Sequence, residues 1–182
     1  MKKMFLSFLF LAASGLMFSA AGFAEGESYF TKVNIWYEKP QKILSTNYHK
    51  GAMLSVGTEV EIIKSGEEKI KFREKATGSE FRIILVKNFT NLNESEFFSR
   101  YFSKENILKD AEYAAFSEAE KEHIKNGTIA EGMSKAATLV AYGYPPTHRT
   151  PSTKENVWTY WKSRLGNFMV QFKDDKISSV AA

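Results

Sequence analysis

The sequence contains no cysteine, and this absence excludes several features at once. There can be no disulfide, no thiolate nucleophile or metal ligand, and no cysteine to carry a lipid anchor. Long apolar runs are also scarce. One runs from Met4 to Phe18, which is shorter than the roughly 20 residues of a membrane-spanning helix, and no second candidate follows. We therefore expect no membrane span.

Motifs that mark catalytic or cofactor sites are missing as well. The three histidines, His49, His123 and His148, lie in different segments, and no pair has the spacing of a zinc-binding helix. Glu120 lies one helical turn before His123, which fits either a weak cation site or, as we favour, a solvated helix face. No Gly-x-Ser-x-Gly elbow and no glycine-rich phosphate loop occur. We expect no catalytic residue, metal or cofactor, and therefore a non-enzymatic protein.

The leading residues have the three-part order of a secretory signal peptide. Lys2 and Lys3 precede the apolar run, and the small-residue stretch Ser19–Ala24 follows it. Cleavage is expected after Ala24, which would leave 23 basic and 21 acidic residues and a net charge of +2. The two signs are interspersed, whereas a nucleic-acid surface needs a concentrated basic face. The pattern predicts an exported protein that binds no nucleic acid.

Residues 25–90 are predicted to form β-strands. Tyr29–Tyr37 alternates between apolar and polar residues, and short β-rich runs follow, separated by turn signals. The expected runs are 42–45, 52–54, 59–63, 69–72 and 81–86. Strands this short and close together favour a small curved barrel, because closure hides the strand edges.

After residue 90 the pattern changes to mixed helix and strand. Asn93 is a candidate N-cap, Ser117 and Glu120 have the spacing of a capping box, and Asn126-Gly127 is a typical helix stop. A further helix is expected from Ser134 to Gly143, and strands at 157–161, 167–172 and 176–180. Residues 91–182 are thus predicted to be an α-α-β-β-β module, which makes the whole chain mixed α+β.

Four segments of this module stand out: IAEGMSK (129–135), AYGYPP (141–146), WTYW (158–161) and VQFKDDKI (170–177). Together they resemble the BamE (SmpA/OmlA) family, small proteins of the Gram-negative outer-membrane assembly machinery. The resemblance implies a periplasmic protein of the cell envelope that associates peripherally with the outer membrane. The chain departs from the family in lacking the lipid-bearing cysteine and in carrying the extra β-rich half, so fold and compartment are what the resemblance implies.

The β-rich half is similar to a bacterial SH3-like barrel. The similarity lies in Tyr48–Gly51 and Val56–Val60, which read as strand, turn and strand. It implies a small all-β barrel at residues 25–90 that precedes the BamE-like module.

Two groups of residues are candidates for binding. Asn47–Gly51 is a polar cluster between strands, in which Tyr48 could stack on a peptide or glycan while His49 and Lys50 hydrogen-bond to it; a plain hairpin turn is the alternative. In the strand 157–161, alternation sends Trp158 and Tyr160 to one face and Trp161 to the other. One face should pack on the helices. The other is either covered by the first half or free to dock a partner.

Two functions fit these observations. The first is a non-enzymatic periplasmic binding or scaffold protein that contacts a protein or another envelope component. The second is a secreted inhibitor or ligand-sequestering protein, because the α-α-β-β-β order is also similar to the small β-lactamase inhibitory proteins.

The export prediction has a direct test. Protein purified from producing cells should begin at Glu25, because signal peptidase cleaves after small residues such as Ala24. Intact-mass measurement and amino-terminal sequencing would show this. A chain that retains Lys2 and Lys3 in the purified protein would contradict it.

Overall fold

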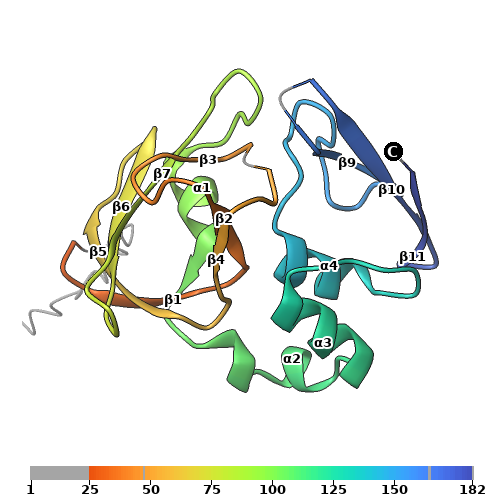
Figure 1. Ribbon diagram of the computed structural model, residues 1–182, viewed down its shortest axis with the longest axis horizontal. Helices are drawn as coiled ribbons and strands as arrows, with labels where there is room; N and C mark the ends of the chain where they lie inside the picture. Colours follow the sequence, from red (N-terminus) through yellow and green to blue (C-terminus); the bar gives the residue numbers. More distant parts are fainter. Residues whose placement is uncertain (1–24, 47, 164, 182) are drawn as a thin grey trace, which may run out of the picture.

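The computed structural model describes residues 25–46, 48–163 and 165–181. Over these residues the chain is a mixed α+β protein in two parts, which lie side by side in Figure 1. The first part is a curled β-sheet, and the second is a three-stranded sheet with a pair of helices. The expected signal peptide and Asn47 lie outside the described residues.

The curled sheet has six strands in the order β3-β7-β6-β5-β1-β8. They are β1 (Ser28–Thr31), β3 (Ile43–Leu44), β5 (Glu59–Lys64), β6 (Lys69–Glu74), β7 (Glu80–Ile84) and β8 (Phe102–Ser103). Neighbours pair antiparallel, except β3 and β7, which are parallel. Among the described residues β3 and β8 pair with no further strand, so the sheet is a half-barrel and not the closed barrel expected from the sequence.

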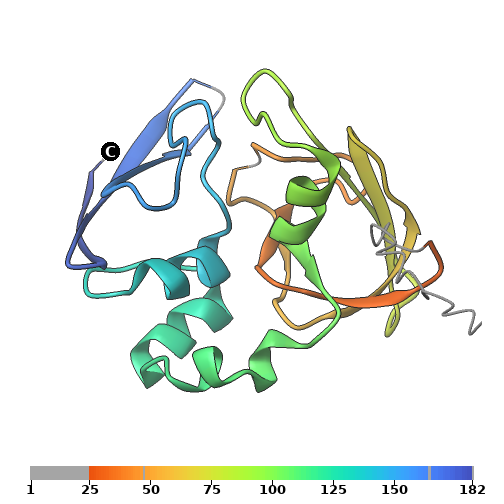
Figure 2. The ribbon, with the colours of Figure 1, turned by 180° about the vertical axis from the view of Figure 1, so that it is seen from behind.

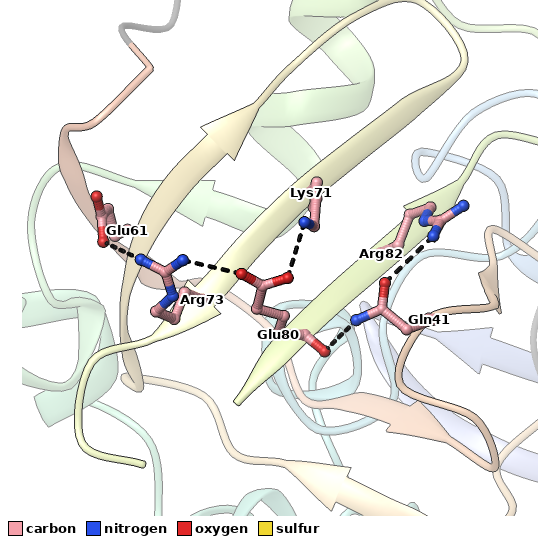
Figure 3. A network of polar contacts seen from close by, with 6 residues as sticks. All are labelled: Gln41, Glu61, Lys71, Arg73, Glu80 and Arg82. Carbon is pink, nitrogen blue, oxygen red and sulfur yellow. Dashed lines mark hydrogen bonds and ion pairs between the residues drawn. The ribbon is translucent and has the colours of Figure 1, made fainter. Parts of the chain in front are cut away.

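The two faces of this sheet differ as the alternation of its residues requires. Val60, Ile62, Ile70 and Phe72 point inward and are fully buried. The outer face carries the polar network of Figure 3, in which Arg73 bonds to Glu61 at 3.2 Å and to Glu80 at 2.8 Å. Lys71 reaches Glu80 at 2.7 Å. These partly exposed pairs are screened by water, so each adds little to stability, and this face is solvated.

A helix that follows residue 90 belongs to the first part. Helix α1 (Glu94–Tyr101) starts at the capping box of Asn93 and Glu96, and it lies in the hollow of the sheet in Figure 2. Phe97 and Phe98 are buried in the first core, which therefore extends past the boundary expected at residue 90. The aromatic face of α1 is apolar and must be removed from water, so it packs into the open side of the half-barrel.

The expected strand 29–37 is split into β1 and β2 (Ile35–Tyr37). Between them the backbone N–H of Lys32 donates to the Tyr101 carbonyl at 2.8 Å and that of Asn34 to the Val140 carbonyl at 3.0 Å. Both acceptors are distant in sequence, so alternation alone could not reveal the break. Strand β2 then pairs with β4 (Ala52–Leu54) as a separate two-stranded sheet.

The second part begins with two helices at the predicted caps. Helix α3 (Glu118–Asn126) has the Ser117–Glu120 capping box and ends at Gly127, whose φ is +63°. Helix α4 (Lys135–Tyr142) has Ser134 as its N-cap. The strands β9 (Val157–Trp161), β10 (Asn167–Lys173) and β11 (Lys176–Ala181) form an antiparallel sheet in the order β11-β10-β9.

A connecting segment runs between the two parts along the lower side of Figure 1. It contains a 3₁₀ turn, η1 (Ile107–Lys109), and the short helix α2 (Ala111–Ala114). Neither has any buried residue, and no apolar periodicity predicts them. We call residues 103–116 the connector.

The two parts are joined through the side chain of Asn34, which is 4% exposed. Its Nδ2 donates to the carbonyls of Ile124 at 2.6 Å and Ala141 at 3.1 Å, which lie on α3 and α4. Its Oδ1 accepts a bond from the Val56 N–H at 2.8 Å. One buried amide thus holds the β-rich part against both helices.

Replacing Asn34 by Ala should destabilise the protein by about 3 kcal/mol, because three buried hydrogen-bonding groups lose their partner. Urea unfolding of the mature protein measures the change. Asn88→Ala, at an exposed asparagine, is the matched control and should shift the free energy of unfolding by less than about 0.5 kcal/mol. Equal effects of the two substitutions would contradict the role assigned to Asn34.

Candidate ligand-binding site

The structure brings together residues from both predicted binding groups. His49, from the loop between β3 and β4, and Tyr160 and Trp161, from β9, line one narrow cavity of ≈ 50 Å³ between the two parts. Tyr48 is half-buried and Lys50 is exposed, and neither lines this cavity. The loop and the aromatic strand were predicted as separate surfaces, because nothing in the sequence indicates that they meet.

His49 is packed into the second part. Its ring stacks on Tyr142, with ring centroids 3.2 Å apart and planes 14° apart, and its Nε2 donates to the Tyr142 carbonyl at 2.6 Å. The rings of Trp36 and Tyr160 stand edge-on to it at 6.2 and 6.1 Å. Burial lowers the pKa of His49 to about 4, although the bond to Tyr142 opposes this shift. At neutral pH His49 is thus an uncharged contact between the parts, and most of its ring is withdrawn from solvent.

The predicted binding residues Trp158 and Tyr160 belong to the second core. Their exposed fractions are 0% and 2%. The Trp158 Nε1 donates to the Glu155 carbonyl at 3.0 Å, and the Tyr160 hydroxyl donates to the Gly143 carbonyl at 2.9 Å. This corrects their assignment to a docking surface, because a partner could reach them only if the core opened. They form the strand face that was expected to pack on the helices.

Trp161 occupies the opposite face of β9 and is half-buried. Its ring lies 5.9 Å from His148, nearly parallel at 18°, and 5.9 Å from Phe89 at 67°. Phe89 comes from the loop after β7, and His148 from the loop before β9. Two neighbouring loop side chains, one from each part, therefore cover the indole, in place of the sheet of the first part.

A much larger hollow than the cavity beside His49 lies between the connector and helix α4. Its volume is ≈ 570 Å³. We call it the junction groove. The residues that line it are Lys32, Val33, Ser103, Lys104, Glu105, Ile107, Asp110, Glu112, Tyr113, Phe116, Ala136, Leu139, Val140 and Tyr144. A volume of this size is typical of ligand sites, which range from about 300 to 1,000 Å³.

The groove was not predicted from the sequence. Ile107, Tyr113 and Phe116 stand in the connector without helical or strand periodicity. On α4, the structure buries Ala137 and Ala141 and leaves Val140 partly buried on the groove wall. The signal that could have indicated the site is this surplus of apolar side chains in a segment with no regular pattern.

Nowhere in the described residues do three His, Asp or Glu side chains gather as potential metal ligands. The Nδ1 of His123 bonds to the Thr128 hydroxyl at 2.8 Å, and that of His148 to the Phe89 carbonyl at 3.0 Å. No described helix has the length and apolar character to cross a membrane.

No protein-family model, curated protein or solved structure matches the chain at a significant level.

The burial of His49 predicts a pH-dependent stability. Its pKa is 6.5 in the unfolded chain and about 4 in the folded protein, so the unfolded state takes up the proton first as the pH falls. The free energy of unfolding should therefore fall by about 2 kcal/mol between pH 6.5 and 4.5, and His49→Phe, which keeps an aromatic ring, should lack this component. Urea titrations at several pH values measure it.

Two comparisons make this test specific. His123→Phe, at a histidine outside the junction, should keep the wild-type pH dependence. Burial raises the pKa of Glu120, but hydrogen bonds from Ser134 and Ser117 outweigh it and bring the pKa to about 2, so this group responds below pH 4.5. If wild type and His49→Phe lose stability equally between pH 6.5 and 4.5, His49 is not the responsible group.

Proposed function

We propose that the chain is an exported, non-enzymatic binding protein of the bacterial cell envelope that holds an apolar segment of a protein partner in the junction groove. The observation that carries the proposal is the groove itself. Its volume of ≈ 570 Å³ lies within the range of about 300 to 1,000 Å³ that is typical of ligand sites.

The walls of the groove support an apolar occupant. Leu139 and Val140 on α4 face it from one side, and Tyr113 and Phe116 of the connector from the other. All four are only partly buried, although they pack beside the second core. Covering such side chains releases about 25 cal/mol for each Å² removed from water, so a partner that fills the groove gains apolar contact on both sides.

The chemistry of the site supports binding over catalysis. The three histidines hold separate positions, each with a hydrogen bond to another group, and none lines the junction groove. A general base must lie within hydrogen-bond reach of its substrate, and histidine, the residue most often used for this role, is absent from the groove lining.

The proposed location of the protein in the periplasm is inferred from the sequence. The signal-peptide pattern of residues 1–24 and the absence of cysteine fit an exported protein without a lipid anchor. The BamE-like segments of the second part support the periplasm, with peripheral attachment to the outer membrane through the partner.

Photo-crosslinking in intact cells tests this function. A benzophenone amino acid at Leu139 should capture a discrete envelope protein, because this side chain lines the groove. The same probe at Met169, a 43% exposed apolar residue on β10, should not capture it. The captured protein is identified by mass spectrometry.

A second substitution tests whether the crosslinked product depends on the groove. Val140→Glu puts a charge on the wall and should abolish crosslinking from position 139. Val157→Glu, on an exposed β9 residue outside the groove, should leave the product unchanged. Equal products from positions 139 and 169, or a product that survives Val140→Glu, would argue against a groove-bound partner.

A further inference from the structure

We infer that the segment held in the junction groove carries a basic side chain, Lys or Arg, that meets the carboxylates of Asp110 and Glu112. This inference rests on the proposed function and names the chemistry of the partner. It follows from the charges on the groove rim, from the position of Glu112, and from the shape of the space around Tyr113.

The basic residues of the rim are already engaged. The Lys32 ammonium donates to the Ser99 carbonyl at 3.0 Å. The Lys104 ammonium pairs with the Glu27 carboxylate and lies 4.0 Å from the centre of the Tyr29 ring. The Glu27 carboxylate cancels the charge of Lys104, whereas Lys32, bonded to a neutral carbonyl, keeps its single positive charge. One uncancelled lysine therefore faces the three acidic residues of the rim.

The acidic residues of the rim are not engaged in this way. Glu105, Asp110 and Glu112 line the groove, and no ion pair forms at any of the three within the described part of the chain. Asp110 stands at the N-cap of α2, but its side chain makes no capping hydrogen bond. The groove therefore presents uncompensated negative charge, which favours a cationic occupant.

The negative charge of Glu112 lies at the groove itself. Glu112 and Tyr144 both line the groove. Burial is the main cause that raises the pKa of Tyr144; the charge of Arg100 opposes this shift and that of Glu112 adds to it. The Arg100 guanidinium lies 4.8 Å from the centre of the Tyr144 ring and lines a different cavity.

The aromatic walls suit the rest of such a side chain. Lys and Arg bury their aliphatic stems against apolar surface and keep the charged end near polar groups. Tyr113 and Phe116 offer that surface, and their rings attract a cation by their negative faces. An apolar neighbour in the same segment would contact Leu139 and Val140 on α4.

The space favours a polypeptide over a compact small molecule. A second cavity of ≈ 410 Å³ lies beside the groove, lined by Leu108 and Ile124 among others. Tyr113 lines both cavities, so the two adjoin at this residue. An extended peptide can run from one cavity into the other and place successive side chains in each.

Peptide display on the mature protein tests the inference. A random peptide library selected on the wild-type protein should be enriched in Lys or Arg next to apolar residues. Individual selected peptides should bind about tenfold more weakly to the double variant Asp110→Asn/Glu112→Gln, because two charge contacts are lost. Glu131→Gln, at an exposed acid outside the groove, should bind them as the wild type does.

The outcomes separate the inference from the proposed function. Selected peptides that lose binding on Leu139→Glu but show no basic enrichment, or that bind the double variant unchanged, would overturn the inference and leave the groove function standing. A failure to select any peptide whose binding depends on Leu139 would overturn both. Enrichment of Asp or Glu would show that Lys32 and Lys104 set the specificity instead.

Discussion

The arrangement of this protein depends on one buried amide. Asn34 reaches from the first part to two backbone carbonyls of the helices in the second, and a third hydrogen bond to Val56 fixes its orientation. Two apolar cores could slide against each other, because apolar contact has no direction. An amide with three fixed partners permits one relative position only, since a buried polar group without a partner is costly.

That fixed position explains why there is a groove at all. The parts are held together at Asn34 and at the stacked rings of His49 and Tyr142, while the connector passes from one part to the other at some distance from α4. The space between them is bounded by apolar side chains of both parts. The shape of the groove depends on the contacts of Asn34 and His49 that hold the two parts together. Substitutions at these contacts should therefore change both the stability of the protein and its binding.

Much of the local structure could be predicted from the sequence. The ends of α3 and α4 depend on neighbours within a few residues: a capping box at Ser117, a left-handed glycine at 127, an N-cap at Ser134. The strands of the second part show alternation that matches their burial. These features are local, and short-range chemistry suffices to find them.

The site could not be predicted in the same way. His49 was read as a loop contact, but Tyr142, 93 positions away, buries it. Trp158 and Tyr160 were read as a docking surface, and their burial is decided by helices packed beneath them. The connector has no periodicity, so its apolar residues gave no indication of a groove. Each difference arises from contacts between distant segments, which no local pattern encodes.

The pairing of β1 with β8 has a consequence for how the protein acquires its structure. Phe30 lies opposite Ser103, so a strand from the first residues of the described chain is completed by one that follows about seventy residues later. In a chain that emerges amino terminus first, the half-barrel stays incomplete until β8 appears. Until then the edge of β1 is open to other strands, and the interval before residue 103 arrives is the period in which a nascent chain of this protein is most exposed to aggregation.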